Sequence, residues 1–294
     1  MNNRLNIIGI GEILWDVFPE GKQLGGAPCN FVYHANKLGA NALAISAVGN
    51  DDNGKEIIEL LSKKNISTKL IEVNDKPTGT VEVKLNDKGV PEYIIHESVA
   101  WDYIRLDDSV KQSLKETDII CFGSLAQRNT ISRGSIVSML QSAAPETRIV
   151  FDINLRQHYY NKKIIENSLQ LCHVLKLNGE ELKIISEMLG LTGDSEESRV
   201  TELIKHYNLQ LLSLTNGSEG SLLMTPFEKS FLPTPKVQVK DTVGAGDSFT
   251  AAMIVGFAKG EPLNELHQQA VDISAFVCTQ DGAMPEYKEI QILK

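Results

Sequence analysis

The segment from Asp241 to Asp247 (DTVGAGD) has the residue types of an anion-binding turn, and a long apolar stretch follows it directly. The small residues Gly244, Ala245 and Gly246 let the backbone approach a ligand closely. Their N–H groups would open a helix, whose dipole favours an anion at this end. A carboxylate beside that anion, Asp247, is unfavourable unless it does chemical work such as accepting a proton. The segment predicts an anion pocket with an adjacent base; the alternative is an ordinary glycine-rich helix start.

A second glycine-containing turn runs from Gly25 to Asn30 (GGAPCN). Gly25 and Gly26 precede Pro28, a residue suited to the first turn of a helix. Asn30 offers an amide that both donates and accepts, and Asp16 lies close enough along the chain to reach the same crevice. Asp and Asn side chains together suit the recognition of sugar hydroxyls. The pattern predicts a polyol site, and the alternative is a tight turn with a helix cap.

The elements that must position these turns alternate between short β-branched runs and helical periodicity. Strands are predicted at 5–10, 42–48, 117–122, 148–153, 173–177 and 210–215, and helices at 28–38, 53–64, 129–142, 178–189, 244–259 and 263–278. This order predicts an α/β fold with a mostly parallel central sheet flanked by helices. Ligands of such sheets bind beyond the carboxyl ends of the strands.

One stretch departs from the alternation. Residues 80–85 alternate strictly between apolar and polar, 86–89 have turn composition, and 92–96 return, which predicts an antiparallel hairpin. A further short strand is expected within 12–18. We expect a small inserted β-sheet lid, discontinuous in sequence and formed by roughly 12–26 and 78–104, within a single domain spanning 1–294.

Composition excludes several classes of protein. The 294 residues carry 29 Lys plus Arg against 38 Asp plus Glu, a formal net charge of −9, which argues against a nucleic-acid partner. The four cysteines make no metal-binding spacing and favour a reduced, cytoplasmic compartment. The longest apolar stretch, 249–258, is about half of what a bilayer requires, so no membrane association is expected. The P-loop motif is absent, and the dinucleotide fingerprint fails at Leu14, which disfavours an oxidoreductase.

The segments 241–247 and 25–30 together resemble the two signatures of the ribokinase-like (PfkB) carbohydrate kinases, and the similarity spans essentially the whole chain. The resemblance implies a ribokinase-like fold in which Asp247 is the catalytic base and the nitrogens of residues 244–246 form the anion hole. It also implies that Asp16 and Asn30 hold sugar hydroxyls, with Gly25 and Gly26 lining the site.

The same resemblance implies a nucleotide site and its ions, with ATP and Mg²⁺ as cofactors. Asn178 and Glu181 resemble the family's N-x-x-E motif, which is linked to magnesium and phosphate; the alternative is a capped helix start. Thr215, Gly217, Thr242 and Gly246 are implied nucleotide contacts. Asp241 would neighbour a monovalent cation, although residues 279–283 lack the basic residue that often precedes the family's Gly-Ala pair, which leaves potassium open.

Asp152, Asn154 and Arg156 alternate at the end of a predicted strand, so an extended backbone would put all three on one face. They would then line the substrate crevice, with Asn154 and Arg156 as sugar contacts; the alternative is a strand that leaves the core into solvent. The pattern D-x-N-x-R resembles fructokinases and 2-keto-3-deoxygluconate kinases.

The prediction is therefore an ATP-dependent sugar kinase, most similar to fructokinases, acting on D-fructose. The segment 92–98 contains no Arg or Lys to hold an acidic sugar, and a carboxylate at Asp16 would repel one. The alternatives are a 2-keto-3-deoxygluconate kinase or another PfkB sugar kinase, and a catalytically inactive sugar-binding regulator. A homodimer through the lid is expected, and contact of His96 with the sugar is left open.

Overall fold

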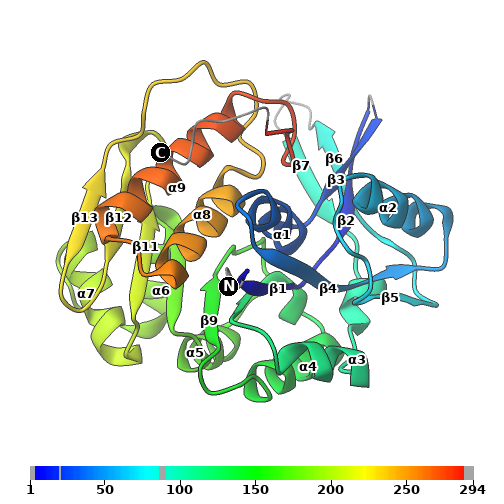
Figure 1. Ribbon diagram of the computed structural model, residues 1–294, viewed down its shortest axis with the longest axis horizontal. Helices are drawn as coiled ribbons and strands as arrows, with labels where there is room; N and C mark the ends of the chain where they lie inside the picture. The colour runs from blue at the N-terminus through cyan, green and yellow to red at the C-terminus, as the bar shows by residue number, and fades with distance from the viewer. Residues whose placement is uncertain (1–3, 20, 86–90, 288–294) are drawn as a thin grey trace.

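The computed structural model describes residues 4–19, 21–85 and 91–287, and its centre is a nine-stranded sheet (Figure 1). The strand order is β13-β12-β11-β10-β9-β8-β1-β4-β5. The strands from β11 to β5 in this order are parallel, and β12 and β13 add an antiparallel edge. Their bounds are β1 Asn6–Ile10, β4 Asn41–Gly49, β5 Ile71–Asn74, β8 Ile119–Phe122, β9 Arg148–Asp152, β10 Val174–Asn178, β11 Leu211–Thr215, β12 Ser221–Met224 and β13 Lys229–Leu232.

Helices cover both faces of this sheet, so its strands are near-continuous apolar runs. On one face Ile7 of β1 packs in a core with α1 Ala27–Lys37, α2 Asp52–Lys63, α8 Ala245–Lys259 and α9 Leu263–Cys278. Ile8 and Ile10 point to the other face and pack in a core with α3 Asp108–Leu114, α4 Thr130–Gln141, α5 Lys162–Leu171, α6 Gly179–Leu189 and α7 Glu196–Tyr207. The predicted α/β architecture is confirmed.

A second, four-stranded sheet has the order β3-β2-β6-β7 and projects at the upper right of Figure 1. Its strands are β2 Leu14–Phe18, β3 Gly21–Gly25, β6 Gly79–Leu85 and β7 Pro91–Ile95. The antiparallel pairing of β6 with β7 confirms the predicted hairpin, whose turn at 86–89 lies outside the described residues. β2 pairs with β6 in parallel, so two separate stretches of chain build this small sheet.

A buried arginine just before α4 ties down the chain that follows β7. Arg128 donates from Nε and Nη2 to the two carboxylate oxygens of Asp102, both at 2.8 Å, and from Nη2 to His96 O, just after β7. Its guanidinium lies 4.0 Å from the ring centre of Trp101 and 4.7 Å from that of Tyr159. Because both charges are buried and paired, this end of the small sheet is held rigidly.

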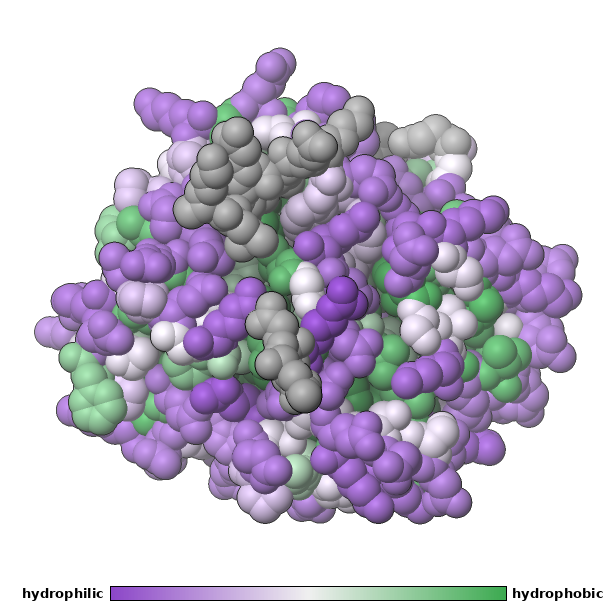
Figure 2. Space-filling model, viewed as in Figure 1, coloured by the Kyte–Doolittle hydropathy of each residue, from purple (hydrophilic) through white to green (hydrophobic). Residues whose placement is uncertain are grey.

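The structure adds elements that periodicity did not predict: β3, β5, β12 and β13 among the strands, and α3, α5 and α7 among the helices. The surface viewed in Figure 2 is mostly hydrophilic, with apolar side chains in separate patches. Within the described part of the chain, no helix combines the length and apolarity that a bilayer crossing requires.

Candidate active site

Two helix N-termini and the carboxyl ends of three central strands meet at one edge of the main sheet. α1 and α8 begin here, opposite the ends of β1, β8 and β9. A cavity of about 20 Å³ lies between them, lined among others by Glu12, Asp152, Asn154 and Asp247. That volume holds about one water molecule. The two glycine-containing turns, more than 200 residues apart in sequence, are thereby brought together as predicted.

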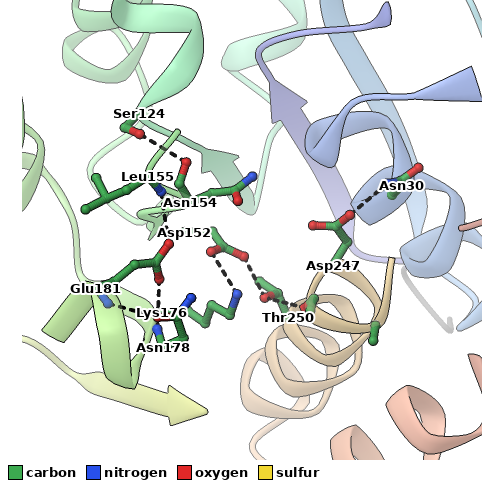
Figure 3. Close-up of polar contacts among 12 residues, drawn as sticks. Asn30, Ser124, Asp152, Asn154, Leu155, Lys176, Asn178, Glu181, Asp247 and Thr250 are labelled. Carbon is green, nitrogen blue, oxygen red and sulfur yellow. Dashed lines mark hydrogen bonds and ion pairs between the residues drawn. The ribbon is translucent and has the colours of Figure 1, made fainter. Parts of the chain in front are cut away.

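Asp247 lies in the first turn of α8 and accepts a hydrogen bond from Asn30 Nδ2 of α1 at 2.8 Å (Figure 3). Burial, and secondarily the charge of Asp152, raises the pKa of Asp247 to about 6. The hydrogen bond from Asn30 and the charges of Lys176 and Arg156 oppose that rise. The group is therefore a carboxylate at neutral pH that can take up a proton more readily than an exposed aspartate.

The N-terminus of α8 requires glycine at its cap. Gly244 has φ +77°, and a Cβ there would lie 2.8 Å from Ala283. The N–H of Ala245 donates to Thr242 O at 3.2 Å. Among the described residues, none accepts a hydrogen bond from the N–H groups of Gly244 or Gly246. These two amides are available to an anion, whereas that of Ala245, the third of the predicted anion hole, already has a partner.

A buried lysine that the sequence analysis missed supports this turn. Lys176 Nζ donates to Asp152 at 3.1 Å, and Thr250 Oγ1 donates to the second carboxylate oxygen of Asp152 at 2.9 Å. A Cβ on Gly246 would lie 3.2 Å from Lys176 Nζ, so the ammonium touches the start of α8. Burial alone would lower the pKa of Lys176, but Asp152, Glu181 and Asp247 raise it, so the side chain is charged.

The motif at Asn178 is a reciprocal helix cap. Asn178 Oδ1 accepts from the N–H of Glu181 at 2.9 Å, and Glu181 Oε2 accepts from the N–H of Asn178 at 2.8 Å. The other oxygen of Glu181 accepts from the N–H of Leu155 at 2.9 Å. Both oxygens are engaged and the residue is buried. Mg²⁺ keeps several waters in its shell, so such a carboxylate fits the ion as an outer-shell partner.

The small sheet supplies the predicted sugar-binding aspartate. Asp16 lies on β2 opposite β3, and a Cβ on Gly25 would overlap its carboxylate. Gly26 has φ +113°, and a Cβ there would overlap the carbonyl oxygen of Glu12. Burial raises the pKa of Asp16 to about 6, and Arg156 opposes the rise. The two glycines thus allow a carboxylate and a backbone turn to approach the same crevice.

The prediction of an extended backbone from Asp152 to Arg156 is wrong. β9 ends at Asp152, and Asn154 adopts φ +44°, a left-handed conformation that asparagine tolerates better than most residues. Asp152 and Asn154 still line the cavity. Arg156 is exposed, and its charge opposes the rise in the pKa values of Glu12, Asp16 and Asp247.

The predicted nucleotide and cation residues lie next along the same edge. The parallel register places Thr215 beside Asn178, and Gly217 follows with φ +53°. Asp241 Oδ1 accepts from the N–H of Val243 at 3.0 Å, and its Oδ2 accepts from the N–H of Gly282 at 3.1 Å. Asp241 therefore ties the turn before α8 to the segment that follows α9.

That following segment, 282–287, also binds α1. His34 Nε2 lies 2.9 Å from Ala283 O, and His34 Nδ1 lies 2.7 Å from the Tyr287 hydroxyl. Because a carbonyl only accepts, Nε2 carries the proton and Nδ1 accepts from Tyr287. Tyr33 donates to Pro285 O at 2.6 Å. The segment holds α1, which carries Asn30, against the turn that opens α8.

Comparison with known proteins identifies the family. The model of the pfkB family carbohydrate kinases matches residues 14–289. The chain belongs to this family. It is 30% identical to the sugar kinase PH1459 of Pyrococcus horikoshii, over 98% of this chain and 94% of the relative. The crystal structure of PH1459, described as an uncharacterized sugar kinase, superposes with a TM-score of 0.83 over 95% of this chain and 93% of that one.

Two further relatives of this kinase differ in the substrates that their names give. The fructokinase of Salmonella typhimurium is 26% identical over 94% of both chains. The ATP-dependent 6-phosphofructokinase of Thermoanaerobacterium thermosaccharolyticum is 23% identical over 100% of this chain and 94% of its own. The fold of this carbohydrate kinase is ribokinase-like. The comparisons do not identify the sugar, because relatives of similar sequence identity are named for different substrates.

Proposed function

We propose that this kinase transfers the γ-phosphoryl group of ATP to a hydroxyl of a neutral sugar, D-fructose, with Asp247 as the base. The observation that carries the proposal is the half-buried hydrogen bond between Asp247 and Asn30 at the open N-terminus of α8. A structure of PH1459, 28% identical, is described as a complex with ATP, which supports ATP as the donor.

The mechanism follows from the charges at this edge. Asp247 takes the proton of the attacking hydroxyl, which Asn30 and Asp16 help to orient. The N–H groups of Gly244 and Gly246 lie at the positive end of the α8 dipole, with Lys176 beneath them, so negative charge that develops on the transferred group is stabilised there. Asn178, Thr215, Gly217 and Thr242 are proposed to line the nucleotide site.

Two ions are proposed beside the nucleotide. Mg²⁺ would neutralise the phosphate oxygens, held through water near Glu181. A potassium ion is proposed near Asp241, whose oxygens each accept one N–H bond and keep lone pairs for a cation. Within the described residues, no group of three or more His, Cys, Asp or Glu side chains is arranged to bind a metal, which favours outer-shell magnesium.

The whole chain is proposed to act as one kinase domain whose small sheet closes over the sugar as a lid. Asp16 comes from this sheet, and closure would exclude water that competes for the phosphoryl group. The base of the sheet is fixed by Arg128, so movement would be confined to its outer part. All four cysteines are free thiols, which suits a cytoplasmic location.

The balance of charge in the crevice favours a neutral sugar. The crevice holds three acidic groups, Glu12, Asp16 and Asp247. The charge of one arginine, Arg156, opposes the rise in the pKa of each. Lys176 is already paired with Asp152. A sugar carboxylate brought into this crevice would lack a cation of its own, and a buried unpaired charge is costly. The charge balance therefore disfavours 2-keto-3-deoxygluconate as the substrate and favours fructose over it.

A panel of sugars with ATP and Mg²⁺ tests the assignment. We expect phosphorylation of D-fructose with kcat/KM at least about tenfold above the values for 2-keto-3-deoxygluconate, ribose and fructose 6-phosphate, a difference of about 1.4 kcal/mol in transition-state binding. Coupled ADP release measures the rates, and NMR locates the phosphate on the product. A tenfold preference for the acidic sugar would refute the choice of fructose but not the kinase. Absence of ADP release with every sugar in the panel would favour the inactive regulator.

The small sheet is also proposed to pair with a second copy, because it exposes large apolar side chains. Tyr93 is 56% exposed and Ile94 is 42% exposed, and they point to opposite faces of β7. We expect wild type to sediment as a dimer and at least one of Tyr93→Asp and Ile94→Asp to sediment as a monomer. Val73→Asp, at a similarly exposed residue on β5 (56%), is the control. A monomeric wild type would rule out the pairing.

A further inference from the structure

His34 is a fully buried histidine on α1 to which the mechanism above gives no part. It lies one helical turn after Asn30, so the two side chains leave the same face of the helix. Asn30 donates to Asp247 on α8, whereas His34 contacts Ala283 in the segment that follows α9. Both contacts of this face are therefore made at the start of α8, one with the proposed base and one with the residue behind the turn.

Ala283 packs directly against the N-cap of α8. A Cβ on Gly244 would lie 2.8 Å from Cα, Cβ and O of Ala283. The preceding residue, Gly282, donates its N–H to Asp241 at 3.1 Å, at the beginning of the same turn. The amide of Gly244 is one of the two that are available to an anion, and Ala283 supports it from behind. A shift of Ala283 would therefore shift this turn.

Both ring nitrogens of His34 are engaged. Nε2 donates to Ala283 O at 2.9 Å, and Nδ1 accepts from the Tyr287 hydroxyl at 2.7 Å. Burial lowers the pKa of His34 to about 4, and the bond to Ala283 opposes the fall, so the ring is neutral at neutral pH. Among the described residues, no other donor reaches Ala283 O. Because that bond is buried, removing the donor would leave an unsatisfied carbonyl away from water.

Other contacts hold the rest of the segment 282–287 in place. Tyr33 donates to Pro285 O at 2.6 Å, and Lys64 Nζ donates to Met284 O at 3.0 Å. These bonds keep the segment attached to α1 and α2 when His34 is changed. The bond from His34 is the one that reaches the residue packed against α8.

We propose that His34 is a positioning residue for phosphoryl transfer, which holds Ala283 against Gly244 and so sets the distance between α1 and the turn that opens α8. The proposal rests on the function proposed above. The sugar contact Asn30 belongs to α1 and the anion-binding amides belong to α8, so this distance decides how the attacking hydroxyl meets the transferred group. It assigns to His34 no contact with sugar or nucleotide.

The two ring nitrogens can be tested separately, because amide side chains of two lengths replace them. Glutamine can place an N–H near Nε2 and keep the bond to Ala283 O, whereas asparagine can place an oxygen near Nδ1 and keep only the bond from Tyr287. Misplacement by about 1 Å can cost 10²-fold, so we expect kcat of H34N to fall roughly 10- to 100-fold. We expect kcat of H34Q and Y287F within about threefold of wild type.

The Michaelis constants separate positioning from binding. Each substrate keeps the groups that bind it, so we expect KM for ATP, and for the sugar with the highest kcat/KM in the panel above, within about threefold in all three variants. Denaturant unfolding gives the folded fraction of each variant under assay conditions, and kcat is calculated for folded enzyme. His173 is the matched control, since its Nδ1 accepts from the N–H of Ile149 at the opposite end of β9. H173N and H173Q should leave kcat unchanged.

Selective ¹⁵N-glycine labelling reports on the turn without turnover. We expect the amide resonances of Gly244 and Gly246 to shift in H34N and to stay near their wild-type positions in H34Q. Both variants lose the imidazole ring, so the loss of its ring current affects both. Unchanged resonances in H34N would overturn the proposal, and so would an equal loss of kcat in H34N and H34Q.

Two further outcomes are decisive. If H34N does not fold, His34→Met replaces it, because methionine fills a similar volume and donates no hydrogen bond; a kcat of H34Q more than about tenfold below wild type then contradicts the proposal. If the glycine resonances shift as expected while wild type phosphorylates no sugar, the proposed function fails and the link between α1 and the turn stands.

Discussion

Asp247→Asn is expected to lower kcat by about 10²- to 10⁴-fold, the usual contribution of a positioned base. Asparagine keeps the size of the side chain and an oxygen that can accept from Asn30, but it cannot take the hydroxyl proton. Sugar binding should stay within about threefold of wild type, because a hydroxyl can still bond to the amide. Steady-state kinetics and calorimetric titration with the preferred sugar measure the two effects separately.

The pH profile of the wild-type enzyme checks the same assignment. Because the base must be ionised, kcat should reach its maximum above the pKa of Asp247, which is about 6. It should fall as the pH drops through that value. Asp51→Asn is a control, since that carboxylate caps α2 away from the site. A D247N enzyme with kcat within fivefold of wild type would show that Asp247 is not the base.

Lys176→Met is expected to cost both activity and stability. It leaves Asp152 buried without its cation, which typically costs about 3–5 kcal/mol in the free energy of unfolding. It also removes the positive charge that touches Gly246 at the start of α8. We expect kcat to fall by roughly 10²-fold or more, the scale seen when one stabilising group of an anion site is lost. Denaturant unfolding and ADP-release kinetics measure the two losses.

The double variant Lys176→Met, Asp152→Asn separates the two effects. Removing both charges should recover most of the lost stability, because no unpaired ion stays buried. It should not recover kcat, because the cation at the start of α8 is still missing. Recovery of kcat together with stability would show that Lys176 acts only through folding.

The central elements of the fold could be predicted because their sequences carry strong signals. β1, with Ile7 in one core and Ile8 and Ile10 in the other, shows the continuous apolar run of a buried parallel strand. The elements that were missed carry weak signals. α7 buries only a narrow stripe around Val200, Leu203 and Ile204. β12 and β13 have only four residues each, and β13 is the antiparallel edge strand, with Phe231 64% exposed.

The two signature turns could be placed in one site because their glycines and carboxylates form recognisable patterns. Lys176 could not, because it belongs to no motif and its partner Asp152 lies 24 residues away in the sequence. The left-handed conformation of Asn154 was not predicted for another reason: alternation of residue types carries no information about the sign of φ.

The contacts of residues 282–287 with α1 and with the turn before α8 set an order of events during biosynthesis. β1, β4 and β8, the core of the main sheet, leave the ribosome within the first 122 residues, together with α1. Asn30 on α1 meets its partner only when Asp247, 217 residues later, has been synthesised, and His34 meets Ala283 and Tyr287 later still. A nascent chain arrested before Ala283 can therefore have most of its sheet assembled and still lack a finished phosphoryl-transfer site.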